Sequence, residues 1–308
     1  MSPLNVSKTE IIDHLCTLGD FLRFAVSQAS TADLYCGHGT LQIWDDMAAL
    51  ILGSLSLPID SPSWIWGSRL LPHEKHHLLA QITCRIEQKV PVPYLTNEAW
   101  FAGLPFYVDE RVLIPRSPFA QIIETQFAPW IAADAIHSVL EIGTGSACMA
   151  IATAFALPQA EIYALDISPD ALAVAKVNVD KHRLSHQVHL LQSDVFSAIA
   201  DTQRFDLIIS NPPYVDGEDM QSLPAEYQHE PTLALAAGTD GLEVVRRILK
   251  GAAAHLNPQG VLMVEVGNSS GALVEAYPTL PFIWVELNEG DDGIFVLTRE
   301  ALLAYQGL

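Results

Sequence analysis

The sequence is poor in basic residues, with 16 lysines and arginines against 36 aspartates and glutamates among 308 residues. The formal net charge at pH 7 is therefore −20. A protein this acidic repels phosphate backbones, so we expect no direct binding to duplex nucleic acid. The same charge favours a basic protein as partner.

Cysteine is also scarce. The four cysteines are widely scattered and form no C-x-x-C pair: Cys16, Cys36, Cys84 and Cys148. This spacing argues against a zinc ribbon and against a disulfide framework, and it suits a reducing cytosol. We expect no metal site, because the histidines in residues 73–77 have no other clustered ligand and are better interpreted as solvated surface.

We expect neither a leader nor a membrane span. Its first ten residues, MSPLNVSKTE, lack a basic stretch followed by an apolar core. The uncharged run over residues 142–160 has the length of a membrane span, but it opens with glycines and its apolar residues are mostly alanine. A strand end followed by a buried helix explains that run better. We therefore expect a cytoplasmic protein without membrane contact.

What is present is a globular composition. Half of the residues are apolar and only 17% are charged, which excludes a disordered chain. A chain of this length can bury a full core and suggests one large domain with a smaller one. Apolar residues recur at helical spacing over residues 11–25 and 44–52, and a further helix is expected over 73–88. We predict a helical N-terminal domain over residues 1–95.

A change of pattern follows this helical part. Pro91 and Pro93 break the helical periodicity, and aromatic residues then flank Gly103 and Pro105. Short apolar runs on either side of a glycine predict a β-hairpin. We assign residues 96–116 to a β-hairpin linker.

From about residue 138, strands and helices alternate. Strands are expected at 139–142, 161–165, 188–191, 205–210 and 261–266, and an antiparallel pair at 282–287 and 294–297, joined by residues 288–293. Repeated βα units predict a doubly wound, mostly parallel sheet of seven strands in an α/β domain, which we assign to residues 117–308. The ligand site of such a sheet lies at the carboxyl ends of its strands.

Residues suited to a nucleotide-like ligand follow three successive strands. After the first strand, Gly143 and Gly145 allow a tight turn and a close approach of backbone N–H groups to a ligand. Asp166 ends the second strand, where a carboxylate can accept both hydroxyls of a ribose. Ser193 and Asp194 follow the third strand, where the carboxylate could accept a hydrogen bond from an adenine amino group.

Two ligands compete for this arrangement. A dinucleotide fingerprint needs a third glycine where Cys148 stands, so the match is poor. S-adenosylmethionine has no pyrophosphate, and the acidic Glu141 before the turn suits its cationic end. Asp166 could instead be a plain helix cap, but Ser168 before Pro169 already fills that role. The residues favour S-adenosylmethionine.

The tetrapeptide Asn211-Pro212-Pro213-Tyr214 follows the fourth strand. Two prolines remove two backbone donors and fix φ, which leaves a rigid turn. The Pro212 carbonyl and the Asn211 side-chain oxygen offer two acceptors for the two hydrogens of one planar NH₂ group, and Tyr214 offers an aromatic face. Holding both hydrogens favours pyramidalisation and aims the nitrogen lone pair at a methyl sulfonium. Such catalysis depends on positioning and preorganised electrostatics.

With this tetrapeptide, residues 138–297 resemble the class I (Rossmann-like) S-adenosylmethionine-dependent methyltransferases, in the branch that methylates planar amino groups. Two groups of that branch are similar over nearly the whole chain, the release-factor glutamine methyltransferases (HemK/PrmC) and the ribosomal-protein glutamine methyltransferases (PrmB). The segment YVDERVLIPR at residues 107–116 resembles both. The next four residues, SPFA, are similar to the PrmB group, where the release-factor enzymes have Pro, Asp, Thr and Glu. Other segments similar to the PrmB group are YCGHGT at 35–40, PYLTN at 93–97, EYQHEP at 226–231 and EVGNS at 265–269.

The resemblance implies transfer of a methyl group from S-adenosylmethionine to the side-chain amide nitrogen of a glutamine, with S-adenosylhomocysteine as product. The substrate it implies is a basic large-subunit ribosomal protein, ribosomal protein three, recognised by the N-terminal domain. The residues expected to bind the cofactor are Glu141, Gly143, Thr144, Gly145, Asp166, Ile167, Ser193, Asp194 and Asn211. Those expected in catalysis are Asn211, Pro212, Pro213 and Tyr214, and those in substrate binding are Asn211, Tyr214, Pro115 and Arg116. The family loop has its last glycine at the position of Ala147 in this chain. We expect cofactor binding to survive that change.

Three alternatives remain. A release-factor glutamine methyltransferase would share the chemistry. A DNA methyltransferase acting on the adenine amino group uses the same tetrapeptide, but the charge of −20 and the lack of a basic stripe speak against it. A catalytically silent binding module on this scaffold conflicts with the intact tetrapeptide.

Overall fold

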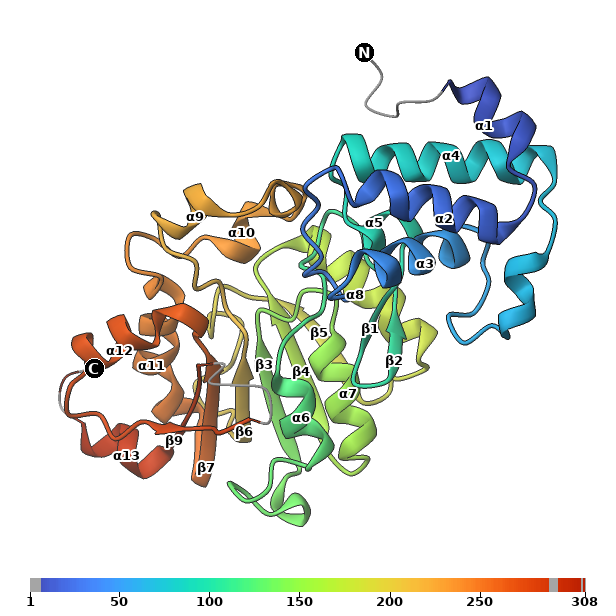
Figure 1. Ribbon diagram of the computed structural model, residues 1–308. Coiled ribbons are helices and arrows are strands. Elements are labelled where there is room, and N and C mark those ends of the chain that lie inside the picture. Colours follow the sequence, from blue (N-terminus) through green and yellow to red (C-terminus); the bar gives the residue numbers. More distant parts are fainter. Residues whose placement is uncertain (1–6, 288–292, 306, 308) are drawn as a thin grey trace. The chain divides into compact units, whose positions relative to one another are not determined.

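The computed structural model describes residues 7–287, 293–305 and 307. The chain divides into two compact units (Figure 1). One unit contains residues up to Ala99 together with Val108–Glu110 and Pro224–His229, and the other contains the rest. The smaller unit is therefore built from three separate stretches of the chain. Among the described residues, no helix is both long enough and apolar enough to cross a membrane.

The smaller unit is helical. Its helices are α1 (Lys8–His14), α2 (Leu18–Ala29), α3 (Ile43–Ser54), α4 (Pro72–Glu87) and α5 (Val92–Thr96), with 3₁₀ turns η1 (Ser63–Gly67) and η3 (Ala225–His229). Apolar side chains of α2, α3 and α4 form its core, among them the fully buried Phe21, Met47 and Leu78. The prolines that end the helical pattern in sequence open α5, because a proline in the first turn of a helix loses no hydrogen bond.

The single helix predicted over residues 11–25 is wrong. The chain forms α1 and α2 instead, because Thr17 caps the second helix. Its hydroxyl accepts from the N–H of Asp20 at 3.1 Å, and the Asp20 carboxylate accepts from the N–H groups of Cys16 and Thr17, both at 2.9 Å. This capping box satisfies the first donors of α2 and ends the periodic run.

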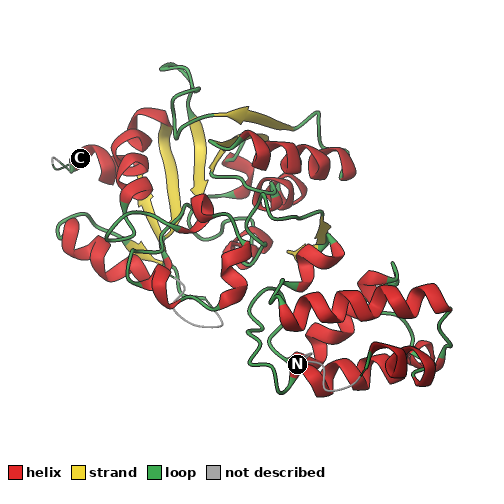
Figure 2. Ribbon diagram, turned by 90° about the horizontal axis from the view of Figure 1, so that it is seen from above, coloured by secondary structure: helices red, strands yellow, loops and turns green. Residues whose placement is uncertain are grey.

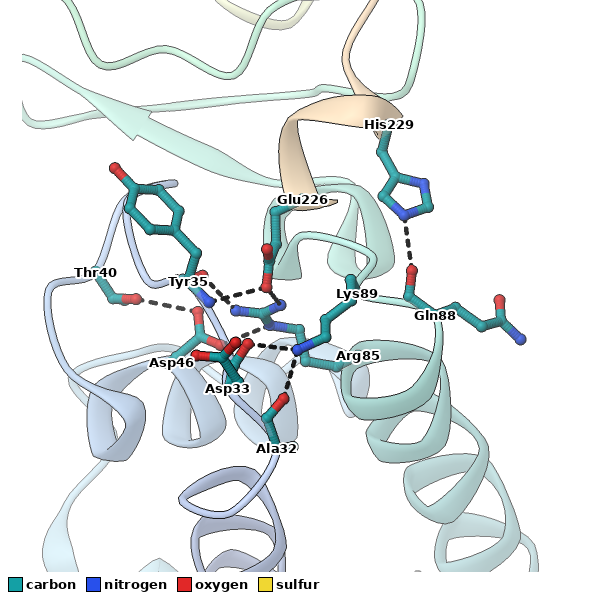
Figure 3. Close-up of polar contacts among 10 residues, drawn as sticks. All are labelled: Ala32, Asp33, Tyr35, Thr40, Asp46, Arg85, Gln88, Lys89, Glu226 and His229. Carbon is teal, nitrogen blue, oxygen red and sulfur yellow. Dashed lines mark hydrogen bonds and ion pairs between the residues drawn. The ribbon is translucent and has the colours of Figure 1, made fainter. Parts of the chain in front are cut away.

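A buried cluster of charges lies inside the smaller unit (Figure 3). The Arg85 guanidinium is 1% exposed and uses all three of its nitrogens. Nε donates to Asp46 at 2.8 Å, one terminal nitrogen to Glu226 at 3.1 Å, and the other to the Tyr35 carbonyl at 2.8 Å. Burial raises the pKa of Glu226, but hydrogen bonds from Tyr35 N–H and Arg85 outweigh it, so the net pKa is lowered. These contacts hold segment 224–229 in the unit.

Replacing Arg85 tests that cluster. Arg85→Met should lower the free energy of unfolding by about 3–5 kcal/mol, because Asp46 and Glu226 would stay buried without their cation. Urea denaturation followed by circular dichroism measures the loss. As a matched control, Lys176→Met removes an exposed ion pair with Asp180 and should leave stability nearly unchanged. A loss no larger than that of the control would contradict the role given to Arg85.

The larger unit contains a seven-stranded sheet with the order β5-β4-β3-β6-β7-β9-β8. The strands are β3 (Ser138–Ile142), β4 (Glu161–Asp166), β5 (Val188–Gln192), β6 (Phe205–Ser210), β7 (Leu256–Glu265), β8 (Ile283–Trp284) and β9 (Ile294–Thr298). The pairs from β5 to β7 are parallel, and β9 runs antiparallel to β7 and β8. The predicted doubly wound, mostly parallel sheet is confirmed.

Helices cover both faces of this sheet (Figure 2). The helices of the larger unit are α6 (Phe119–Glu124), α7 (Cys148–Ala156), α8 (Pro169–Lys181), α9 (Asp219–Ser222), α10 (Thr232–Leu235), α11 (Glu243–His255), α12 (Ser270–Ala276) and α13 (Arg299–Ala304), with 3₁₀ turns η2 (Ala133–Ala135) and η4 (Gly267–Ser269). Alternate residues of β3 show the two layers, since Val139 packs with α7 and α8 while Leu140 packs with α11. This alternation follows from the period of two along a strand.

The predicted strand limits hold to within one residue for β3, β4, β5, β6 and β9. Two strands depart further: β8 ends at Trp284 rather than at residue 287, and β7 begins at Leu256 rather than at residue 261. Its first part contains Pro258 and Gly260, and its register against β6 shifts there, so the sequence pattern hides it. The hairpin predicted around Gly103 is present as β1 (Ala99–Phe101) and β2 (Leu104–Phe106). The predicted connection over 288–293 lies outside the described residues except for Gly293.

Candidate functional site

The carboxyl ends of β3 and β6 lie side by side. Ile142 pairs with Ser210, the last residue of β6, and the buried Ser210 hydroxyl donates to the Ile142 carbonyl at 2.7 Å. Gly143 and Asn211 come next on the two strands. A Cβ placed on Gly143 would lie 3.9 Å from the Asn211 carbonyl oxygen. The glycine turn and the tetrapeptide Asn211-Pro212-Pro213-Tyr214 therefore start as neighbours.

The glycine turn is tied to the end of β4. The N–H groups of Gly143 and Thr144 both donate to the Leu165 carbonyl at 2.8 Å, and the N–H of Gly145 donates to the Asp166 carboxylate at 2.8 Å. Each of these three N–H groups is therefore bonded inside the protein, and the approach of backbone N–H groups at the start of α7 to a ligand stays a prediction. What the glycines supply is positive φ, +75° at Gly143 and +54° at Gly145, and open space.

Ala147 occupies a backbone conformation that normally needs glycine. Its φ is +63°, it is fully buried, and it is the residue before the first turn of α7. The left-handed conformation costs an alanine about 1–2 kcal/mol. Burial of the methyl group stabilises the folded state by about 0.8 kcal/mol. Because alanine gives the unfolded chain less freedom than glycine does, it contributes about 0.4–1 kcal/mol more. The two sides nearly cancel, which explains how the chain accommodates alanine here.

Substitutions at Ala147 test this balance. Ala147→Gly should change the free energy of unfolding by less than about 1 kcal/mol, because relief of strain is offset by lost burial and added chain entropy. Ala147→Val should destabilise by more than about 2 kcal/mol, since a β-branched side chain at positive φ is a severe outlier. Urea denaturation of both variants measures the two changes. A large increase in the free energy of unfolding for Ala147→Gly would mean that backbone strain outweighs the two stabilising effects.

Glu141 is a buried acid below the turn. It is 1% exposed, and the Thr144 hydroxyl donates to its carboxylate at 2.7 Å. Burial raises the pKa of Glu141 to about 8, against the opposing effect of the Thr144 hydrogen bond. At neutral pH the carboxyl therefore holds a proton for most of the time, and a cation placed against it would favour the ionised form.

This raised pKa makes folding stability depend on pH. The protonated Glu141 contributes stability in full below its ordinary pKa of 4.5, and that contribution is lost as pH rises through about 8. Between pH 5 and pH 9 the wild type should therefore lose a few kcal/mol that Glu141→Gln retains. Urea denaturation of both proteins at the two pH values measures the difference. Identical pH dependence would show that Glu141 ionises normally.

Asp166 joins two pieces of the site. Besides Gly145, its carboxylate accepts from the N–H of Ser168 at 2.9 Å, while the Ser168 hydroxyl caps α8 by accepting from the N–H of Ala171 at 3.2 Å. Burial raises the pKa of Asp166, against these hydrogen bonds. Each carboxylate oxygen keeps a further lone pair for a ligand. Ile167 beside it is 47% exposed, which leaves an apolar side chain at the strand end.

The residues after β5 are already engaged. The buried Ser193 hydroxyl donates to the Val195 carbonyl at 2.8 Å and accepts from the N–H of Ala198 at 3.0 Å, so it shapes the local turn. Asp194 is exposed and forms a 2.7 Å ion pair with Arg247 of α11. Sequence reasoning missed Arg247, because nothing local links it to Asp194.

The tetrapeptide presents one side chain that is available. Asn211 is partly exposed and its side chain makes no hydrogen bond with any other residue that the structure describes. Tyr214, in contrast, is held, since its hydroxyl donates to Glu265 at 3.1 Å and its carbonyl accepts from the Ser269 hydroxyl at 2.8 Å. Sequence reasoning did not assign these two partners a role, although both lie in the quoted EVGNS segment.

Pro115 and Arg116, expected among the substrate-binding residues, lie in a structural segment. Pro115 is buried, and Arg116 forms a bidentate ion pair with Glu230, both bonds at 2.7 Å. The Glu230 side chain is fully buried and also accepts from the N–H of Ile114 at 3.0 Å. Arg116 therefore has a partner within the chain, and its contact with substrate stays a prediction.

Comparison with known proteins places this site in context. Residues 126–227 match the family model of the methyltransferase small domain. The chain is 44% identical over 298 residues to the ribosomal protein uL3 glutamine methyltransferase of Francisella tularensis subsp. tularensis, covering 96% of this chain and 95% of that protein. It is 46% identical over 301 residues to the protein of the same name from Neisseria meningitidis serogroup B, covering 97% and 99%. Among solved structures, the hMettl16 catalytic domain in complex with MAT2A 3'UTR hairpin 6 shares the fold, with a TM-score of 0.50 at 17% identity over 73% of this chain and 80% of that one.

Proposed function

Because this chain belongs to the family of the ribosomal protein uL3 glutamine methyltransferases, we propose that it transfers a methyl group from S-adenosylmethionine to the side-chain amide nitrogen of a glutamine in ribosomal protein uL3. One observation carries the proposal. The glycine turn and the tetrapeptide Asn211-Pro212-Pro213-Tyr214 begin next to each other, at the carboxyl ends of two paired strands. That arrangement supports a cofactor loop beside acceptors for a planar amide.

The residues present fit S-adenosylmethionine, which supplies an activated methyl group when it is bound. The turn at Gly143 and Gly145 leaves open space at the strand end. The Glu141 carboxyl lies beneath this turn and favours a cation above it. Free lone pairs of Asp166 would accept ribose hydroxyls, and the exposed Ile167 would cover an adenine face. Asp194 would reach an adenine amino group only by sharing or leaving its ion pair with Arg247.

The tetrapeptide would hold the substrate. The Asn211 side-chain oxygen and the Pro212 carbonyl would accept the two hydrogens of the glutamine amide, and the Tyr214 ring would lie against its plane. Withdrawing the two hydrogens from the amide plane frees the nitrogen lone pair for the methyl group. No general base is required, because the extra proton of the product can leave to water after transfer. The reaction is accelerated by positioning and preorganised acceptors.

A basic protein substrate fits the charge of this chain. The formal charge of −20 attracts basic chains and repels a DNA duplex, which disfavours the adenine amino group as acceptor. A release-factor glutamine would present the same amide, so the alternatives differ in what binds rather than in the chemistry. We place the reaction in the cytoplasm, as part of ribosome biogenesis.

Substitution of Asn211 tests the mechanism. Asn211→Ala should leave the Kd for S-adenosylmethionine nearly unchanged while kcat falls by about a hundredfold to a thousandfold, the usual effect of removing one preorganised hydrogen bond. Asn211→Asp keeps an acceptor and should retain partial activity. Calorimetry gives the Kd, and transfer of labelled methyl groups to uL3 gives kcat. A wild-type rate for Asn211→Ala would sink this mechanism.

The substrate is identified by a separate experiment. Mass spectrometry of ribosomal proteins from cells lacking this gene should show uL3 lighter by one methyl group, and the purified chain with S-adenosylmethionine should restore that mass. Release factors and adenine-containing duplex DNA serve as competing acceptors in the same assay. Methylation of either one in preference to uL3 would replace the proposed substrate.

A further inference from the structure

The Tyr214 ring is enclosed by the segment Glu265–Ser269 that follows β7. The ring lies so close to Gly267 that a Cβ there would be 2.6 Å from a ring carbon. Gly293 backs Gly267 from another side, since a Cβ on Gly293 would lie 2.6 Å from the Gly267 carbonyl oxygen. Neither glycine can carry a side chain without moving the ring or the backbone. The ring therefore has one fixed support beneath it.

The hydroxyl end of Tyr214 is fixed by a buried carboxylate. Glu265 is 3% exposed and accepts from the Tyr214 hydroxyl at 3.1 Å through one oxygen. Its other oxygen accepts from the Ser117 hydroxyl at 2.5 Å, and that hydroxyl accepts in turn from the N–H of Phe119. Ser117 is itself buried, so the hydrogen bonds that join α6 to Glu265 are shielded from water, and the bond from Tyr214 to Glu265 is partly buried.

We propose that Glu265 is a positioning residue for methyl transfer, which sets the angle of the Tyr214 ring through the tyrosine hydroxyl and is itself oriented by Ser117. The proposal rests on the proposed function, in which that ring lies against the planar amide. Glu265 donates no proton to substrate and takes none from it. Its carboxylate accepts from the Ser117 and Tyr214 hydroxyls, and its effect reaches the amide through the ring.

A kinetic double-mutant cycle tests the proposal in the full-length chain. Glu265→Ala should lower kcat by about tenfold to a hundredfold, as expected for a misplaced reacting group, with the Kd for S-adenosylmethionine unchanged. Glu265→Gln should rescue most of the rate. The glutamine oxygen can accept a hydrogen bond from one hydroxyl, and the other hydroxyl can turn to accept one from the glutamine NH₂. In the Tyr214→Phe background, Glu265→Ala should cost almost nothing more. Independent, multiplicative losses from the two substitutions would overturn the proposal.

A control separates positioning from stability. Asp206 is a structural carboxylate of β6 at the opposite end of the sheet, accepting from the N–H groups of His137 at 2.9 Å and Ser138 at 3.0 Å. Asp206→Ala should lower the unfolding temperature and leave kcat unchanged. If Glu265→Ala does not fold, the same cycle is run with Ser117→Ala, and multiplicative losses there would equally overturn the proposal.

Failure of this inference can be told apart from failure of the proposed function. If the acceptor is a release-factor glutamine or an adenine, the substrate assignment fails, and the cycle is run on that acceptor because the planar amino group is shared. Ring signals of labelled Tyr214, recorded by NMR without any acceptor, should move in Glu265→Ala and stay near their wild-type positions in Glu265→Gln. Unmoved signals in Glu265→Ala would overturn the inference whatever the substrate.

Discussion

The parallel pairing of β3 with β6 is the constraint on which the site depends. Ser210 closes this pair at its carboxyl end by donating to the carbonyl of Ile142, both of them shielded from water. Two loops from distant parts of the chain can leave the sheet as neighbours only because their strands end at the same level. A slip of one residue would turn each side chain of the strand to the other face and separate the turn from the tetrapeptide.

Much of the sheet could be predicted because its signals are local. Ser168 before Pro169 predicts the start of α8, and short apolar runs predict the strands. The site could be located by the same means, since the carboxyl ends of parallel strands share one edge. Contacts between distant residues leave no such pattern. Glu226 is 141 residues from Arg85, and Glu265 is 148 from Ser117, so neither partner could be read from spacing.

The buried glutamates Glu141, Glu226, Glu230 and Glu265 play three different roles in this chain. Glu226 and Glu230 each neutralise an arginine, Glu265 accepts from two hydroxyls, and Glu141 is protonated near neutral pH. The formal charge of −20 counts all of them alike. Composition gives only the formal net charge, whereas the chemical state of each carboxyl is decided by burial and by its partner. This is also why the roles of Asp194 and Arg116 needed the structure, since both form ion pairs within the chain.

The smaller unit is discontinuous, and this limits how the chain can have diversified. Its third stretch, Pro224–His229, begins ten residues after Tyr214 in the sequence. The buried Glu226 of this stretch forms an ion pair with Arg85. A chimera joined at a single junction near residue 96 would take Arg85 and Glu226 from different parents, and a parent lacking either residue would leave the other buried without its partner. The helical unit and the stretch that follows the tetrapeptide therefore have to match each other in any such exchange.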